Sequence, residues 1–220
     1  MNPLRILVAD DNESMRAAYK KILETRVDFE VVGMASDGQE ALEKYNEFEP
    51  DVVILDVRMP KLDGLAVANR IMSGSSPAGI VLASAYDDLA FARAIMHDDA
   101  SRKAYVLKSS LANISEFIRI VEAVAKGQAV LHENMIKSLM ERYHRMPDSE
   151  APQITGIEED ILKLMLEGYD ESEIAQKLDQ PFQQVDLLAD SICEKLGVIK
   201  QDGVSRSPQV VQAIVNLCIY

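Results

Sequence analysis

Short apolar runs alternate with amphipathic segments through the first 127 residues. Residues 4–9, 29–35, 52–55, 79–83 and 104–107 are runs typical of buried strands. Each run is followed by a segment with apolar residues at helical spacing, the last of them over about 112–126. Five strands that alternate with five helices predict a parallel sheet with helices on both faces. The continuous Val, Ile and Leu content of the strands fits burial on both sides of that sheet.

The pattern beyond residue 128 is helical throughout. A helix is predicted over 129–143, and the polar stretch 144–152, which contains two prolines, is typical of a linker. Thr155 and Glu158 then have the spacing of a capping box, and Gly168 is a stop signal for the helix that they begin. Two further helices and a last one near the C-terminus follow.

These patterns predict two domains and a connection. We expect an α/β domain over 1–128, an inter-domain helix and linker over 129–153, and an all-α domain over 154–220. A length of 220 residues also favours two domains of ordinary size over one.

The composition is that of a globular protein, with 48% hydrophobic and 27% charged residues. No run approaches the roughly 18 apolar residues of a membrane span, and the N-terminus lacks the layout of a signal peptide. Cys193 and Cys218 form neither a disulfide framework nor a metal-binding spacing. We therefore expect a cytoplasmic protein without a membrane partner.

The net charge of −13 argues against a chain built mainly to wrap nucleic acid. Residues 1–150 contain 18 basic and 24 acidic residues, a net charge of −6. Residues 151–220 contain 5 basic and 12 acidic residues, a net charge of −7 on less than half that length. The all-α domain is thus the more acidic of the two per residue.

Three carboxylates follow the ends of predicted strands. Asp10 and Asp11 come after the first strand and Asp56 after the third. Open parallel sheets bind ligands at the carboxyl ends of their strands, so these side chains are expected to lie together. Crowded negative charges favour a cation, and hard oxygen ligands suit Mg²⁺. The sequence therefore predicts a magnesium site at this edge.

A hydroxyl and an ammonium group are expected at the same edge. Ser84 follows the fourth strand and Lys108 follows the fifth. A carboxylate nucleophile, a divalent cation, a hydroxyl donor and an ammonium together suit the acceptance of a phosphoryl group as an acyl phosphate.

The segment 4–127 resembles the receiver domain of two-component response regulators. The matching residues are Asp10-Asp11, Asp56, Met59-Pro60, Asp63-Gly64, Ser84-Ala85, Tyr105 and Leu107-Lys108. The resemblance implies a flavodoxin-like fold with a five-stranded parallel sheet, and a histidine kinase or phosphotransfer protein as partner. One segment departs from the family, because residues 98–104 replace its usual compact, glycine-rich turn.

The same resemblance implies a role for each matching site residue. Asp56 would be the phosphoacceptor, with Mg²⁺ held by Asp10, Asp11, Asp56 and the backbone carbonyl of Arg58. Ser84 and Lys108 would contact phosphoryl oxygens. Tyr105 would be the switch aromatic that turns inward when Ser84 engages the phosphoryl group.

The segment 154–220 resembles the LuxR-type helix-turn-helix of the NarL/FixJ response regulators. The matches include Glu173-Ile174-Ala175 in the support helix and Lys195-Leu196-Gly197-Val198 at the end of the recognition helix. This resemblance implies transcription regulation through DNA, and commonly a homodimer formed by the last helix.

The expected DNA-contact positions do not fit that role. Asp186 stands where the family usually carries the lysine of a Thr-Val-Lys-x-His pattern on the recognition helix, and Asp186, Asp190 and Glu194 recur every four residues as one acidic stripe. An acidic row repels phosphates instead of binding them. The insertion over 201–207 adds only one basic residue, Arg206.

Two interpretations of the acidic helix remain open. The stripe could face water, with Gln183 and Gln184 reading bases. Alternatively, the output domain binds protein, such as a basic partner or its own receiver domain, which Leu188 in place of a polar contact residue favours.

A third function class is a Mg²⁺-dependent phosphatase with an aspartyl intermediate. Such enzymes place a second acid two residues after the nucleophile, and here that position is Arg58. We therefore expect a phosphorylated switch and not an enzyme.

Overall fold

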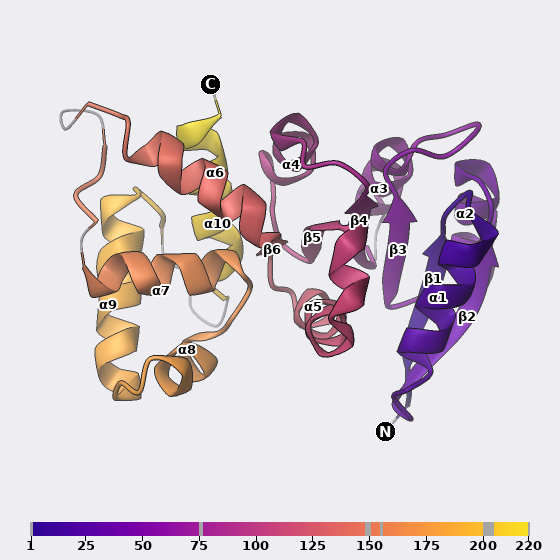
Figure 1. The fold of residues 1–220 in the computed structure, drawn as a ribbon, viewed down its shortest axis with the longest axis horizontal. Helices are drawn as coiled ribbons and strands as arrows, with labels where there is room; N and C mark the ends of the chain where they lie inside the picture. Colours follow the sequence, from indigo (N-terminus) through magenta and orange to yellow (C-terminus); the bar gives the residue numbers. More distant parts are fainter. Residues whose placement is uncertain (1, 75–76, 148–150, 155, 200–204, 220) are drawn as a thin grey trace. The chain divides into compact units, whose positions relative to one another are not determined.

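The computed structural model describes residues 2–74, 77–147, 151–154, 156–199 and 205–219 (Figure 1). Thr155 of the expected capping box, residues 148–150 of the expected linker and residues 201–204 of the insertion lie outside the described residues. The chain divides into two compact units, residues 1–87 with 102–126 and residues 88–101 with 127–220.

The strands form one sheet at the centre of the first unit. They are β1 (Leu4–Ala9), β2 (Phe29–Ala35), β3 (Val52–Asp56), β4 (Gly79–Ser84) and β5 (Lys103–Leu107). The pairs β1–β2, β1–β3, β3–β4 and β4–β5 are all parallel. The predicted α/β fold with a parallel sheet is confirmed, and a two-residue strand, β6 (Val130–Leu131), adds a sixth member where only a helix was expected.

The strand order is β2-β1-β3-β4-β5-β6. The chain builds outward from β1 in one direction to β2 and then in the other from β3 onward. The direction of strand addition therefore reverses at the neighbouring strands β1 and β3. Open α/β sheets bind ligands at such a switch point, outside the carboxyl ends of the strands. Asp10 directly follows the last residue of β1, and Asp56 is the last residue of β3.

Four helices and one 3-10 turn accompany this sheet. They are α1 (Glu13–Leu23), α2 (Gly38–Phe48), α3 (Gly64–Met72), α5 (Ile114–Ala125) and the 3-10 turn over Lys108–Ala112. Asn12, Asp37 and Asp63 cap the first three helices by accepting hydrogen bonds from backbone N–H groups. Helix α1 contacts α5, and α2 contacts α3, so the two pairs form the helical layers of the unit.

The second unit contains the remaining helices. They are α4 (Leu89–Met96), α6 (Glu133–Tyr143), α7 (Ile157–Leu166), α8 (Glu171–Lys177), α9 (Phe182–Lys195) and α10 (Ser207–Cys218). Helices α7, α8 and α9 pack on one another, as a helix-turn-helix requires. Residues 88–101 were expected to belong with the sheet, but by their contacts they group with this unit. None of the described helices is long and apolar enough to span a membrane.

Helix α10 is enclosed by its neighbours. It packs against α4, α6 and α7, and none of residues 207–218 is exposed. Gln212 donates hydrogen bonds to the carbonyls of His97 and Asp98 at 3.0 and 2.6 Å, and Asn216 donates to His97 at 3.0 Å. The helix that the resemblance assigns to dimerisation is thus part of the core of its own unit.

Glu158 joins α7 to α9. Its buried carboxylate accepts hydrogen bonds from the Ser191 hydroxyl at 2.8 Å and from the Lys195 ammonium at 2.6 Å. The capping box predicted for Thr155 and Glu158 is not tested, because Thr155 lies outside the described residues, whereas Asp170 and Glu173 form a capping box at the start of α8.

Replacing Glu158 tests this contact. In Glu158→Ala, the Lys195 ammonium loses its carboxylate and the Ser191 hydroxyl its acceptor. The free energy of unfolding of the second unit should therefore fall by about 1–3 kcal/mol in chemical denaturation. The control Glu194→Ala removes an exposed carboxylate of α9 and should change it by less than about 0.5 kcal/mol. Equal losses in the two variants would contradict the assigned contact.

Candidate functional site

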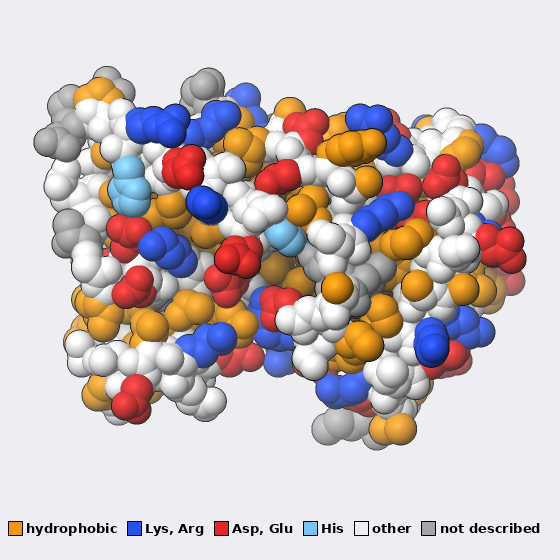
Figure 2. All heavy atoms as spheres, in the orientation of Figure 1, with side chains coloured by type: hydrophobic (Ala, Val, Ile, Leu, Met, Phe, Trp, Pro, Cys, Tyr) orange, Lys and Arg blue, Asp and Glu red, His pale blue; other side chains and the backbone are white. Residues whose placement is uncertain are grey.

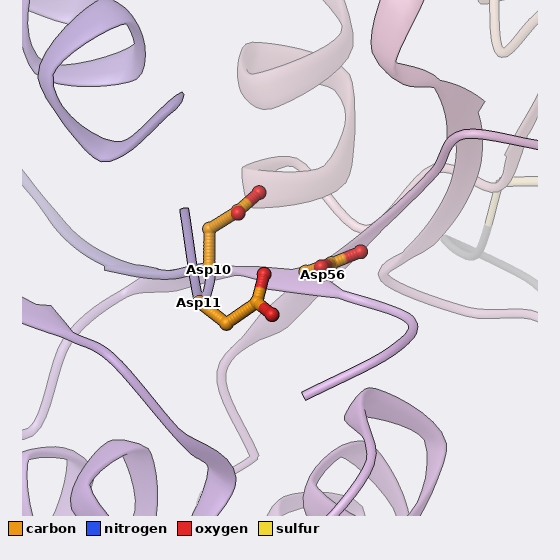
Figure 3. Close-up of side chains that lie close together, drawn as sticks. All are labelled: Asp10, Asp11 and Asp56. Carbon is orange, nitrogen blue, oxygen red and sulfur yellow. The ribbon is translucent and has the colours of Figure 1, made fainter. Parts of the chain in front are cut away.

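Three carboxylates gather at the carboxyl edge of the sheet. Asp10 and Asp11 follow β1 and Asp56 ends β3, two strands that pair directly. One ligand oxygen from each lies within 4.8 Å of the others, and Figure 3 shows the three side chains close together. Asp10 and Asp56 are buried, whereas Asp11 is exposed. The predicted gathering of these three residues is confirmed.

Lys108 bridges the two buried carboxylates. Its Nζ lies 2.7 Å from Oδ2 of Asp10 and 3.1 Å from Oδ2 of Asp56. Burial alone would lower the pKa of Lys108, but the hydrogen bonds to Asp10 and Asp56 outweigh it and raise the pKa. Lys108 is therefore a permanent cation at this edge.

The environment of Asp56 combines opposing influences. Burial raises the pKa of its carboxyl group, and the contact with Lys108 works against that rise without cancelling it. The backbone N–H of Arg58 also donates to the carboxylate. One carboxylate oxygen of Asp56 thus lies against the ammonium of Lys108, while the neighbouring Asp11 is exposed to solvent.

The donor set fits a divalent cation. Three carboxylates and one ammonium leave an excess of two negative charges within a few ångströms, and oxygen ligands are those that Mg²⁺ prefers. Asp10, Asp11 and Asp56 are therefore the residues that could hold such an ion.

Gly64 permits the close approach of α3 to the site. A Cβ atom at this position would lie 2.2 Å from the carbonyl oxygen of Asp56, a distance that no side chain tolerates. The Asp63-Gly64 pair thus has two local functions, since Asp63 caps α3 and Gly64 lets the helix start against β3.

Ser84 and Tyr105 are connected through one loop residue. The buried Ser84 hydroxyl accepts a hydrogen bond from the N–H of Tyr86 at 3.0 Å. The buried Tyr105 hydroxyl donates to the carbonyl of Tyr86 at 3.1 Å. The expected switch aromatic therefore points inward, and the loop that leads to α4 lies between it and Ser84.

The sequence-based prediction named Arg58 only for its backbone carbonyl, and it missed Tyr86 and Arg16. Tyr86 is exposed, and the guanidinium of Arg58 lies 5.3 Å from the centre of its ring, so these side chains bridge the loops after β3 and β4. Arg16 donates to the carbonyls of Asp10 and Asp11 at 2.7 and 3.2 Å. These roles depend on tertiary contacts. The only signal in the sequence is that Arg58 lies two residues after Asp56, and Tyr86 two residues after Ser84.

Tyr19 was expected only as part of an apolar helical stripe. Its ring packs 5.5 Å from that of Phe117, and its hydroxyl is buried without a hydrogen-bond partner in the described part of the chain. Burial raises the pKa of Tyr19, and the negative charges of Asp10 and Asp56 raise it further. The acidic edge of the sheet therefore faces a neutral phenol on the α1 side.

The acidic stripe of α9 is largely an internal ion cluster. Arg206, at the start of α10, lies 2.8 Å from both Glu171 and Asp186 and 2.7 Å from Asp190. Its side chain is only 12% exposed. Burial works to lower the pKa of Arg206, but the three carboxylates raise it. The predicted acidic stripe of Asp186, Asp190 and Glu194 is present on α9, and two of its three acids, Asp186 and Asp190, also pair with Arg206.

The other described cations of residues 151–220 are also engaged. Lys163 pairs with Glu159 at 2.6 Å, and Lys195 pairs with Glu158. The ammonium of Lys177 lies 4.3 Å from the centre of the Tyr169 ring. Over α7 and α8, blue side chains lie beside red ones on the face drawn in Figure 2. The helix-turn-helix scaffold is present, whereas a row of free cations is not seen among its described residues.

A match to a protein-family profile identifies the class of the protein. The profile described as "Response regulator receiver domain" matches residues 6–132, more than half of the chain. The chain therefore belongs to the response regulator family.

Relatives extend the similarity beyond that domain. The chain is 30% identical over 203 residues to the oxygen regulatory protein NreC of Staphylococcus carnosus (strain TM300), covering 89% of this chain and 92% of NreC. It is 26% identical over 232 residues to the transcriptional regulatory protein DegU of Brevibacillus brevis, covering 98% and 94%. A solved LuxR-family two-component response regulator from Aurantimonas sp. SI85-9A1 is similar with 27% identity and a TM-score of 0.58, covering 66% of this chain and 100% of that one. The chain is thus a response regulator of the NarL/LuxR type.

Removal of the Lys108 ammonium should destabilise the first unit. In Lys108→Met, the carboxylates of Asp10 and Asp56 remain buried without their shared cation, so the free energy of unfolding at neutral pH should fall by about 1–3 kcal/mol. Denaturant titration monitored by circular dichroism measures this change. The control Lys21→Met removes an exposed lysine of α1 and should have little effect. An unchanged stability of Lys108→Met would mean that the bridge contributes nothing.

Proposed function

We propose that the protein is a signalling switch that accepts a phosphoryl group on Asp56. The observation that carries this proposal is the position of the Asp56 carboxylate, with Lys108 at 3.1 Å and the oxygens of Asp10 and Asp11 within 4.8 Å. Phosphoryl transfer depends mainly on positioning and charge neutralisation, which such a site supplies. The protein would act as an acceptor and not as an enzyme with sustained turnover.

The transfer step follows from the residues at the site. A carboxylate oxygen of Asp56 attacks the phosphorus of a phosphohistidine on a histidine kinase or phosphotransfer protein. The O–P bond of an acyl phosphate forms while the P–N bond breaks, and the leaving imidazole keeps the electron pair and takes a proton. Lys108 is placed to pair with a phosphoryl oxygen. Mg²⁺ bound by Asp10, Asp11 and Asp56 would offset the charge of the phosphoryl oxygens.

The hydrogen bonds around Tyr86 suggest how the switch is transmitted. A phosphoryl oxygen on Asp56 would accept a hydrogen bond from the Ser84 hydroxyl, whose oxygen already accepts one from the Tyr86 N–H. The carbonyl of Tyr86 in turn accepts from Tyr105. A shift of Ser84 would therefore move the loop that precedes α4 and the ring of Tyr105 together.

A phosphodonor assay tests the acceptor. Wild-type protein incubated with acetyl phosphate and Mg²⁺ should gain the mass of one phosphoryl group, whereas Asp56→Asn or omission of Mg²⁺ should abolish the adduct, because the nucleophile or its counter-charge is missing. The control Asp51→Asn alters an exposed aspartate at the opposite end of the same strand and should be phosphorylated normally. An adduct that persists in Asp56→Asn would show that the acceptor is another residue.

The output domain allows two proposals. The helix-turn-helix scaffold and the similarity to DegU, which is named as a transcriptional regulatory protein, support transcription regulation. The engagement of Lys163, Lys177, Lys195 and Arg206 with other side chains supports a second candidate, in which the output domain acts by binding protein. Backbone recognition of DNA needs cations directed at phosphates.

The salt dependence of DNA binding separates these candidates. For phosphorylated full-length protein and a random-sequence duplex, the protein-binding candidate predicts a slope of log K against log salt no steeper than about −1, because few phosphates are neutralised. Fluorescence anisotropy over a series of salt concentrations measures this slope. A slope of about −4 or steeper, with tight binding at low salt, would instead establish conventional DNA binding.

A further inference from the structure

The outward side of α9 lacks basic residues and carries an exposed leucine. Gln183, Leu187 and Glu194 lie on one stripe of the helix, because their spacings of four and seven residues return to the same side. All three are exposed, and Leu187 is 69% exposed. We call these three residues the outward α9 face. We propose that this face binds a basic, amphipathic helical segment of another protein, an inference that rests on the protein-binding candidate above.

The core side of α9 shows that Leu187 is not needed for packing. Val185, Ala189, Ile192 and Cys193 are the buried residues of this helix, and they contact the rest of the helix-turn-helix unit. Phe182, in the first turn, is 46% exposed as well, but it lies off the outward α9 face because it is five residues from Leu187. Large apolar side chains exposed on a recognition element are typical of contacts with protein rather than with phosphate.

Charge identifies the chemistry of the partner. Residues 151–220 have a net charge of −7, counting every basic residue in the segment. Arg206 contributes no outward charge, because its guanidinium lies against Glu171, Asp186 and Asp190. Asp186 keeps 39% of its side chain exposed beside that contact, and Glu194 is exposed on the outward α9 face. A partner that places an apolar residue on Leu187 is therefore favoured when Lys or Arg flanks that residue.

The same charges disfavour the other occupants. Residues 1–150 of the chain carry a net charge of −6 and a second copy of the whole chain carries −13, so both would approach an acidic surface with the wrong sign. Duplex DNA would bring phosphates to Glu194 and Asp186 without a free cation on the outward α9 face. A basic amphipathic helix offers both the apolar contact and the complementary charge.

A synthetic peptide provides the probe. An 18-residue helix of Leu and Lys at amphipathic spacing, about five turns long, is titrated into phosphorylated full-length protein. A peptide of the same pattern with Glu in place of Lys serves as the charge control and should not bind. The double variant Leu187→Ser/Glu194→Lys should bind the Leu/Lys peptide at least about tenfold more weakly than wild type, because it loses the apolar contact and reverses the local charge.

A matched variant controls for the change in net charge of the protein. Val27→Ser/Glu30→Lys changes one fully exposed valine and one exposed glutamate in the first unit, and it alters the net charge equally. It should bind the Leu/Lys peptide within about twofold of wild type. Equal weakening in both double variants, or none in Leu187→Ser/Glu194→Lys, would overturn the proposal.

Two further measurements keep the inferences separate. Binding of the same peptide to Asp56→Asn measures the outward α9 face separately from the phosphorylation of Asp56. If the phosphodonor assay fails while α9-dependent peptide binding persists, the acceptor proposal is wrong and the outward α9 face stands. If a random-sequence duplex binds and the Leu187→Ser/Glu194→Lys variant strengthens that binding while leaving peptide binding unchanged, the face belongs to DNA and the proposal fails.

Discussion

The contact of one ammonium with two buried carboxylates is the interaction on which the carboxyl edge of the sheet depends. Lys108 comes from the loop after β5, while Asp10 and Asp56 come from β1 and β3, so the contact joins three separate strand ends. Two buried carboxylates at this distance would otherwise repel each other at high cost. The parallel sheet brings the residues together, and the positive charge of Lys108 offsets the repulsion between the two carboxylates.

A second group of charges organises the output unit on the same physical basis. One guanidinium, that of Arg206, contacts carboxylates on α8 and α9, and one carboxylate, that of Glu158, connects α7 to α9. Arg206 gathers carboxylates from two helices, whereas Glu158 contacts a hydroxyl and an ammonium of α9. Residues at family DNA-contact positions therefore serve the internal structure of this domain.

The carboxyl edge of the sheet was predictable from sequence because each of its charged residues follows or ends an apolar run. In a parallel sheet such ends must meet, so Asp10, Asp56 and Lys108 could be placed together without coordinates. The contacts of Arg206 could not be predicted, because they join residues 16 to 35 positions apart whose approach depends on helix packing. Periodicity also gave no sign that residues 88–101 would group with the second unit.

The position of Tyr86 has a consequence for spectroscopy. Its backbone is hydrogen-bonded to Ser84 and Tyr105, while its ring is largely in solvent beside Arg58. The chain contains seven tyrosines and no tryptophan. An indole introduced by Tyr86→Trp would therefore be the sole tryptophan fluorophore of the protein, located in the loop that any rearrangement around Ser84 must displace, and its emission would follow that rearrangement in real time without an attached dye.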